Sequence, residues 1–371
     1  MKKMNKEPKE KRKIKVLHYG YSYNSGGIEN IVLSWARRKN QCIQFDFIND
    51  TNRHLAFEEE LKAYGCKVIN IADRNNHPIK HIFDINTILK NDDYDFLHMH
   101  VMDIDEAIPI ILANKTKKTK AIVHCHSNRY MGLNFKEKVL IMLTKIELIG
   151  ARYLRVSCAK ESGKKMFGNN HFSVINNGID LKRFAFDEIS RNEIRKKFNI
   201  RNSDIVIGHV GRPCIEKNYP FIFSTFSKLL KYNKNYKLLL IGDFIGDKCI
   251  DFLIEKNSIR DNVIISGVVN DTSKYYSAMD LFYMPSISEG LPIACMEAQA
   301  SGLFAIVSNN VPDEVKVSDN IIFIELDEDI AIEELKKGID KRIDRKKIKI
   351  DSKISIDETS RQLFDFYYHN L

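Results

Sequence analysis

The stretch that says most about the architecture runs from residue 281 to residue 302 and reads LFYMPSISEGLPIACMEAQASG. Its first four residues are an apolar run that predicts a β-strand. Pro292 predicts the start of a helix, because proline is tolerated at the first helical position. A strand, a polar loop and a helix in this order form the building unit of a parallel α/β sheet. The loop carries Glu289 and the helix carries Glu297.

The same alternation of short apolar runs and helix-length stretches extends along most of the chain. Helices are predicted at stretches such as 28–38 and 136–148. Regular strand–helix alternation indicates right-handed βαβ units and parallel sheets buried on both faces. We therefore predict an α/β fold of two facing, doubly wound, Rossmann-like domains with a cleft between them. The predicted strands are 14–18, 43–48, 67–71, 96–100, 121–124 and 153–157, then 205–210, 236–241, 263–265, 281–284 and 304–307.

The length of 371 residues also favours two domains over one. We predict a basic tail at 1–13, an N-terminal domain at 14–183 and a C-terminal domain at 184–356. The segment 175–184 contains Asn-Gly and Asp, which mark an exposed turn between the two patterns. The last stretch, 357–371, has apolar residues at helical spacing. It could dock on either domain, and packing back on the N-terminal domain is the preferred arrangement.

Composition excludes several classes of protein. The apolar share of 44% and the charged share of 29% are typical of folded globular chains. Seven cysteines are scattered singly, which argues against a disulfide framework or a zinc ribbon and favours a reducing compartment. No apolar run approaches the ~18 residues that span a bilayer. We expect a cytoplasmic protein that is neither exported nor integral to a membrane.

The net charge of +9 and the basic tail raise the question of an anionic partner. The tail could be a solvated terminus, a nucleic-acid arm or a contact to anionic lipid. The other basic residues are dispersed and no recognition motif accompanies them, so no nucleic-acid partner is predicted. Peripheral contact with the inner face of the membrane stays open.

Two cations and two carboxylates are the main candidates for chemistry. In residues 207–218, IGHVGRPCIEKN, a predicted strand is followed by Arg212 and Lys217. A planar donor fork and a compact charge can together hold a diphosphate without a metal. Glu289 and Glu297 can accept hydrogen bonds from sugar or ribose hydroxyls. A surface pair of cations and a capped helix with one surface glutamate are the alternative interpretations.

Further candidates lie in the first half of the chain. Gly26 and Gly27 follow the first strand and would let the backbone approach a ligand, although a plain tight turn explains them equally well. His98-Met-His100 and His124-Cys-His126 place each pair on one face of a strand. Four imidazoles could gather as a metal site. A His126 that faces the cleft and positions a hydroxyl is the preferred interpretation, and no metal or cofactor is predicted.

Taken in order, several motifs resemble glycosyltransferase family 4. They span residues 14 to about 310 and comprise Gly26-Gly-Ile-Glu29, the two His-x-His strand ends, Val156-Ser157, Asn176-Asn-Gly-Ile-Asp180, Gly211-Arg212 with Lys217-Asn218, and Glu289 with Glu297-Ala298. The resemblance implies the GT-B architecture, retention of anomeric configuration and catalysis without a bound metal. It also implies a nucleotide-sugar donor, with a UDP-sugar as the first expectation, and a glycan or lipid-linked acceptor in surface polysaccharide synthesis.

The same resemblance assigns roles to individual residues. Arg212 and Lys217 would bind the donor diphosphate, Glu297 the ribose, and Glu289 the donor sugar together with the backbone of Gly290 and Leu291. Gly26 and Gly27 would close over the phosphates, and His126 would contact the sugar near the reacting carbon. Gly211 and Val268 complete the predicted donor-binding set.

Two departures from the family pattern stand out. The helix start reads Glu-Gly-Leu-Pro where many relatives have Glu-Gly-Phe-Gly, so position 292 has no backbone N–H. The basic segment 336–353 has no obvious counterpart. Two other functions remain open: a sugar-nucleotide 2-epimerase built on the same scaffold, and a non-catalytic partner subunit that keeps the fold.

Overall fold

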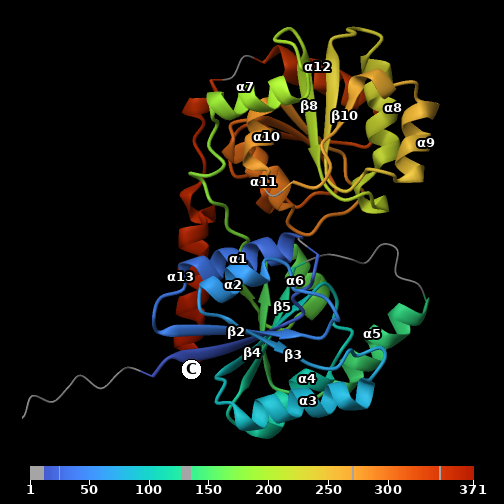
Figure 1. The fold of residues 1–371 in the computed structure, drawn as a ribbon. Helices are drawn as coiled ribbons and strands as arrows, with labels where there is room; N and C mark the ends of the chain where they lie inside the picture. The colour runs from blue at the N-terminus through green and yellow to red at the C-terminus, as the bar shows by residue number, and fades with distance from the viewer. Residues whose placement is uncertain (1–11, 25, 127–134, 270, 342–343) are drawn as a thin grey trace, which may run out of the picture.

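The computed structural model describes residues 12–24, 26–126, 135–269, 271–341 and 344–371. These residues form two parallel β-sheets, and helices cover both faces of each sheet (Figure 1). The N-terminal sheet has seven strands in the order β3-β2-β1-β4-β5-β6-β7, and the C-terminal sheet has six in the order β10-β9-β8-β11-β12-β13. The predicted α/β architecture of two Rossmann-like domains is confirmed.

The strands of the N-terminal sheet are β1 (Ile14–Tyr19), β2 (Ile43–Asn49), β3 (Lys67–Asn70), β4 (Phe96–Val101), β5 (Lys120–Cys125), β6 (Tyr153–Ser157) and β7 (Ser173–Val174). Those of the C-terminal sheet are β8 (Ile205–Val210), β9 (Tyr236–Ile241), β10 (Val263–Ile265), β11 (Leu281–Met284), β12 (Phe304–Ser308) and β13 (Ile321–Ile324). Two of these strands were not predicted. β7 has only two residues, and β13 is a four-residue apolar run, too short for periodicity to separate strand from helix.

The helices of the first half are α1 (Gly27–Arg38), α2 (Glu58–Ala63), α3 (Pro78–Asn91), α4 (Ile108–Thr116), α5 (Phe135–Glu147) and α6 (Lys160–Phe167). Those of the second half are α7 (Glu188–Lys197), α8 (Tyr219–Leu229), α9 (Lys248–Lys256), α10 (Ser273–Ala278), α11 (Ile293–Ala300), α12 (Glu328–Asp340) and α13 (Ile356–His369). Side chains fix several of the helix starts. Asp187, Asp247 and Asp327 each accept backbone N–H groups of the first turn of α7, α9 and α12.

The strand order reverses once in each sheet, and this determines where loops meet. β1 is flanked by β2 and β4, and β8 is flanked by β9 and β11. Helices leave the two neighbours in opposite directions at such a switch point, which opens a crevice beyond the carboxyl ends of the strands. The loops after β8 and β11 are therefore neighbours in space although about 70 residues separate them in sequence.

The last helix crosses back from the C-terminal half to the N-terminal sheet. α13 lies beside α1 (Figure 1), and its residues Leu363, Phe364 and Tyr367 are buried in the same core cluster as Trp35. Gly178 permits this crossing, because a Cβ there would lie 2.0 Å from Thr359 Oγ1 and 2.6 Å from the Cα of Ile356. The domain limits 14–183 and 184–356 stay a prediction, and residues 1–11 of the basic tail lie outside the described residues.

Direct contacts also join the two halves. Cys158 and Ala159 from the N-terminal half share a buried cluster with Leu291 and Val311 from the C-terminal half. The backbone N–H of Lys160 donates to a carboxylate oxygen of Glu314 at 3.0 Å. The loops that follow the parallel strands thus face one another from both halves.

The basic segment after α12 is held by one partly buried guanidinium. Arg345 donates to the carbonyl oxygens of Tyr276, Ser277, Met279 and Ser301 and to the hydroxyl of Ser301. Burial lowers the pKa of Arg345 to about 9. These five hydrogen bonds connect Arg345 to the ends of α10 and α11. They help to fix the position of α11, the helix that carries Glu297.

Candidate active site

The central feature of the site is an ion pair between two of the predicted residues. Lys217 follows β8 and Glu289 follows β11, and Lys217 Nζ lies 2.7 Å from Glu289 Oε1. The side chains are only 16% and 12% exposed. Because partly buried charges need partners, the pair neutralises two groups that would otherwise be costly to remove from water.

The two loops are also joined by two hydrogen bonds that end on main-chain carbonyl oxygens. The N–H of Ile287 donates to the carbonyl oxygen of Glu216 at 2.7 Å, and the side-chain amide of Asn218 donates to the carbonyl oxygen of Pro285 at 3.1 Å. These bonds fix the relative positions of Lys217 and Glu289 independently of the ion pair. The site is therefore preorganised by main-chain contacts.

Gly211 makes room for the lysine. A Cβ at Gly211 would lie 3.0 Å from Lys217 Cε, so the lysine side chain runs directly over the glycine backbone. The neighbouring Gly242 has φ +152°, and a Cβ there would come within 2.1 Å of the Gly211 carbonyl oxygen. Both glycines permit close approach of the backbones at the carboxyl ends of β8 and β9.

Arg212 is separate from the ion pair and faces the other half. Its side chain is exposed, and its positive charge opposes the rise in pKa that burial imposes on Glu29 of α1. Lys217 and Arg212, the two cations predicted to act together, therefore differ in their surroundings. Lys217 is bound to a carboxylate, whereas Arg212 is presented to solvent near the N-terminal glycine loop.

The start of α11 differs in one detail from the prediction. Pro292 is the N-cap residue, with φ −73° and ψ 102°, and the helix begins at Ile293. The expectation of proline at the first helical position is wrong by one residue, because Pro292 keeps extended backbone angles. Glu289 and Gly290 precede the cap, and the N–H of Leu291 contacts the thiol of Cys158, whose pKa is raised mainly by burial.

Glu297 lies within α11, and its surroundings suppress its charge. Burial raises its pKa to about 7, and a hydrogen bond from the hydroxyl of Tyr276 at 2.9 Å partly opposes that rise. The charge of Arg183 also lowers the pKa, while that of Asp271, which pairs with Arg183 at 3.0 Å, raises it. Sequence reasoning missed Tyr276, Arg183 and Asp271, since no motif sets them apart from other surface and core residues.

The N-terminal glycine loop is built around a buried carboxylate. Glu29 is 5% exposed and accepts the N–H groups of Gly26 at 3.0 Å and Ser22 at 3.1 Å. A Cβ at Gly26 would lie 2.8 Å from a Glu29 oxygen, and one at Gly27 would lie 3.6 Å from Ile293 Cδ1 at the start of α11. The glycine loop and the α11 start therefore meet across the two halves.

Two other predicted residues lie apart from the ion pair. Val268 follows β10, the edge strand, and is 64% exposed. His126 follows β5 and is 8% exposed, with its Nε2 3.0 Å from Nδ1 of His100. Burial lowers the pKa of His126 to about 3, so the ring is neutral. The donor-binding role of Val268 and the sugar contact of His126 stay predictions.

Comparisons with known proteins point to the class of protein. Residues 190–353 match the family described as Glycosyl transferases group 1. The putative glycosyltransferase EpsF of Bacillus subtilis is 26% identical over 86% of this chain and 85% of its own length. The capsular polysaccharide biosynthesis glycosyltransferase CapH of Staphylococcus aureus is 23% identical over 82% of this chain and 84% of its own length. The prediction of a glycosyltransferase is supported at this level.

The chain is also similar to two further proteins. The Escherichia coli UDP-Gal:alpha-D-GlcNAc-diphosphoundecaprenol alpha-1,3-galactosyltransferase is 26% identical over 62% of this chain and 62% of its own length. Among solved structures, Anabaena HepE in complex with UDP and glucose superposes with a TM-score of 0.78 over 96% of this chain and 99% of that chain, at 15% identity. The latter likeness bears on the fold alone.

The pKa of Glu297 leads to a prediction about stability. Between pH 4.5, its ordinary pKa, and about 7, Glu297 binds more protons in the native state than in the unfolded state, so its contribution to the free energy of unfolding falls as pH rises. Glu297→Gln cannot ionise and should gain stability relative to wild type from pH 5 to pH 7, by up to about 1.4 kcal/mol per pH unit. Urea unfolding at pH 5, 6, 7 and 8 measures the difference.

Tyr276→Phe provides a second arm of the same experiment. It removes the hydroxyl that stabilises the charged form of Glu297, so the pH range over which stability is lost should extend upward. A Glu297→Gln difference that stays constant from pH 5 to pH 8 would contradict the raised pKa.

Proposed function

We propose that the protein is a retaining, metal-independent glycosyltransferase of the family 4 type, which moves a hexose from a UDP-sugar to a glycan or lipid-linked acceptor. The observation that carries the proposal is the Lys217–Glu289 ion pair at the β8/β11 switch point, opposite the Gly26–Gly27 loop. A cation and a carboxylate held at such a crevice suit a ligand that carries both phosphate and hydroxyl groups.

In this proposal the donor diphosphate replaces Glu289 as the partner of Lys217. Glu289 is then released to accept hydrogen bonds from hydroxyls of the donor sugar. Arg212 adds a second positive charge from the open side, and the free N–H groups at the start of α11 add a partial positive charge. Together they stabilise the negative charge that develops on the leaving diphosphate.

Retention fits a front-face reaction. The acceptor hydroxyl attacks the anomeric carbon on the side from which the diphosphate departs, and the leaving phosphate oxygen takes the hydroxyl proton. One glycosidic bond forms, one sugar–phosphate bond breaks, and the nucleoside diphosphate leaves. Glu297, neutral or charged according to pH, is assigned to the ribose hydroxyls.

Removing either cation should reduce turnover strongly. Lys217→Met and Arg212→Met each take away a group that stabilises developing charge, and we expect turnover to fall by about 100- to 1,000-fold. Lys228→Met is the matched control, because Lys228 also pairs with a glutamate of the C-terminal half, Glu328, but lies on α8. Release of UDP from a panel of UDP-sugars with oligosaccharide or lipid-linked acceptors measures the rate.

Near-normal transfer by both variants would contradict the assignment. Conversion of a UDP-sugar to a new epimer without acceptor, seen by NMR, would instead favour the 2-epimerase. Absence of both transfer and epimerisation, with UDP still bound, would favour a non-catalytic subunit.

We further propose that the N-terminal half contacts an anionic membrane surface through α5. Only Thr144 of this helix is buried, and six apolar side chains on or just after it are about half exposed or more: Phe135, Leu140, Met142, Leu143, Ile146 and Ile149. Some of them line a shallow hollow of ≈ 300 Å³. A helix of this kind, with Lys136, Lys138 and Lys145 exposed beside the apolar residues, suits the headgroup region of a bilayer.

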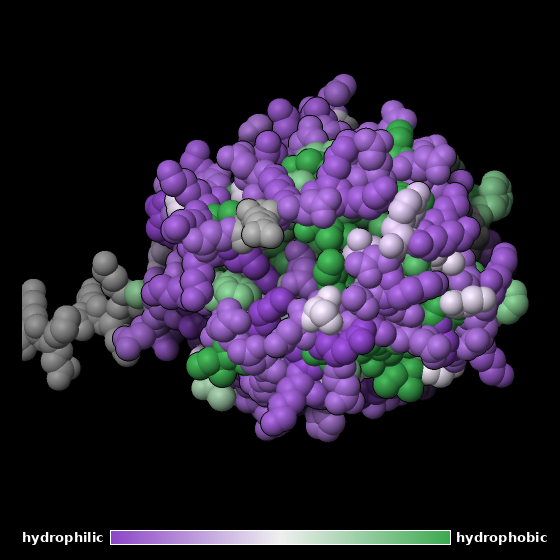
Figure 2. All heavy atoms as spheres, turned by 90° about the horizontal axis from the view of Figure 1, so that it is seen from above, coloured by the Kyte–Doolittle hydropathy of each residue, from purple (hydrophilic) through white to green (hydrophobic). Residues whose placement is uncertain are grey.

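One other surface of the molecule differs from α5. The face over the C-terminal half is mostly hydrophilic, with apolar side chains in small separate groups (Figure 2). Figure 1 places α5 at the rim of the N-terminal half, far from that face. Among the described residues no helix combines the length and apolarity that crossing a bilayer requires.

Liposome sedimentation tests the membrane contact. Replacing Phe135, Leu143 and Ile146 by serine should lower binding to anionic vesicles more than tenfold, since each side chain contributes ~1.5–3 kcal/mol when buried in lipid. The matched control replaces Ile189, Ile245 and Phe252, exposed apolar residues of the C-terminal half. Equal loss in both triple variants, or no binding by the wild type at low salt, would rule out α5 as the contact.

A further inference from the structure

The core of the N-terminal half contains a cluster of five histidines. They lie on or directly after three adjacent parallel strands, β1, β4 and β5, and their exposed fractions run from 0% to 8%. Strand register brings them together, because His18 is aligned with His98 and His100 with His124. The members of this histidine cluster are His18, His98, His100, His124 and His126.

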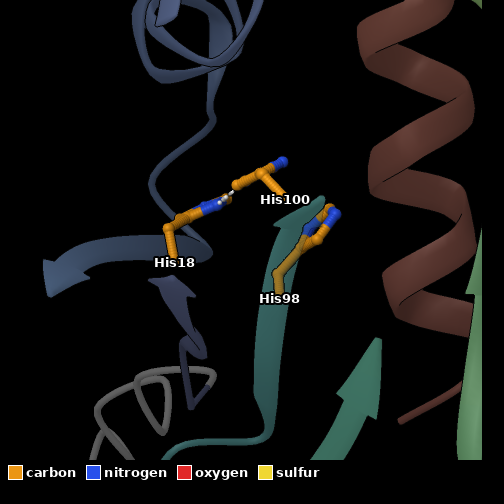
Figure 3. A group of neighbouring side chains, drawn as sticks. All are labelled: His18, His98 and His100. Carbon is orange, nitrogen blue, oxygen red and sulfur yellow. Dashed lines mark hydrogen bonds between the residues drawn. The ribbon is translucent and has the colours of Figure 1, made fainter. Parts of the chain in front are cut away.

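The cluster consists of two hydrogen-bonded rows. In one, Nδ1 of His18 lies 2.8 Å from Nε2 of His100, and Nδ1 of His100 lies 3.0 Å from Nε2 of His126. In the other, Nε2 of His98 lies 3.0 Å from Nδ1 of His124, and the remaining nitrogen of His98 bonds the hydroxyl of Tyr367. Figure 3 shows His18 and His100 pointing at each other with His98 beside them.

The two rows are stacked on each other. The ring centroids of His98 and His100 are 4.5 Å apart, and those of His124 and His126 are 4.2 Å apart. The indole of Trp35 stacks on the ring of His124 at 5.7 Å. The rings are therefore held in place by contacts on their faces as well as their edges.

These hydrogen bonds do not use every ring nitrogen of the cluster. A neutral imidazole has one N–H and one lone pair, so each of its two ring nitrogens can take one partner. Nε2 of His18, Nε2 of His124 and Nδ1 of His126 have no hydrogen-bond partner among the described residues. A buried nitrogen without a partner is unfavourable, and this cluster has more buried ring nitrogens than partners for them.

We propose that the histidine cluster binds one divalent transition-metal ion, with His100, His124 and His126 as its ligands. One ring nitrogen of each lies within 4.8 Å of one ring nitrogen of each of the other two. Neutral imidazoles are the ligands that Zn²⁺, Ni²⁺ and Cu²⁺ favour. A tetrahedral Zn²⁺ with Zn–N bonds of ~2.0–2.1 Å requires nitrogens ~3.3 Å apart, which small ring tilts can supply.

The other two histidines act as positioning residues. Nε2 of His100 faces His18 and Nδ1 of His124 faces His98, so these two ligands can donate their second N–H to a neighbouring ring and keep a lone pair for the ion. The ion displaces the hydrogen bond between His100 and His126. Whichever of these two rings carries the proton of that hydrogen bond, the proton moves to the second nitrogen of the same ring. Binding of the ion therefore releases no proton.

The ion would stabilise the fold and take no part in glycosyl transfer. Its ligands come from β4 and β5 of the N-terminal sheet, whereas Lys217 and Glu289 lie in the C-terminal half. His98 connects the cluster to Tyr367 of α13, so the ion would also strengthen docking of that helix.

Metal content of the purified protein tests the proposal directly. The full chain, made without a histidine tag in zinc-supplemented medium and purified without chelator, should retain one zinc per chain by elemental mass spectrometry. Because the cluster is buried, a second sample is unfolded with chelator and refolded with Co²⁺, which should give the visible absorption of a site with three histidine nitrogen ligands and no thiolate ligand.

Phenylalanine substitutions separate the ligands from other buried histidines. His124→Phe and His126→Phe keep a ring for stacking but should abolish retention, and His18→Phe should weaken binding by about 10- to 100-fold. His209→Phe is the control, because His209 is fully buried in the C-terminal half and should leave the metal content unchanged.

Three results would overturn the proposal. They are the absence of retained ion in both wild-type samples, a Co²⁺ spectrum of thiolate type from the cysteines, and unchanged metal content in folded His124→Phe. The fluorescence of Trp35, the single tryptophan, reports whether each variant is folded. If the ligand variants do not fold, the wild-type content and His18→Phe decide the question.

Discussion

The adjacency of β8 and β11 is the constraint on which the site depends. Parallel strands deliver their following loops to the same edge of the sheet, and at a switch point the two loops diverge on either side of a crevice. Lys217 and Glu289 therefore meet at 2.7 Å although neither is near the other in sequence. Backbone hydrogen bonds between the loops hold that arrangement, so the charge pair is a property of the topology.

The second half of the site comes from the other sheet. The start of α1, with Gly26, Gly27 and the buried Glu29, approaches the start of α11, and the charge of Arg212 acts on Glu29 across the two halves. A ligand between these helix starts would meet cations, a carboxylate and free N–H groups at once. The crossing of α13, which Gly178 permits, ties the two halves together behind this region.

Much of the fold could be predicted from the sequence, because buried parallel strands are apolar runs with clear ends. Eleven predicted strands match observed ones to within one or two residues, whereas β7 and β13 are too short to give a pattern. The pairing of Lys217 with Glu289 required strand order, which periodicity does not reveal. The same holds for two contacts between residues distant in sequence. Tyr276 donates a hydrogen bond to Glu297, and Arg345 binds the ends of α10 and α11.

The histidines illustrate the same limit. Their spacing indicated one face of each strand, and a metal site was an open alternative, but His18 carried no signal because it stands alone on β1. Only the register of three strands shows that five rings gather in one core. The burial of these rings and their unpartnered nitrogens, both properties of the folded chain, then distinguish this cluster from isolated core histidines.

The affinity of Glu289→Gln for UDP, measured by isothermal titration calorimetry beside wild type, tests the central claim most directly. If the diphosphate replaces Glu289 as the partner of Lys217, the variant has no carboxylate to displace and should bind UDP at least as tightly as wild type. Its transfer activity should be lost with its sugar contact. Clearly weaker UDP binding by Glu289→Gln would contradict the account.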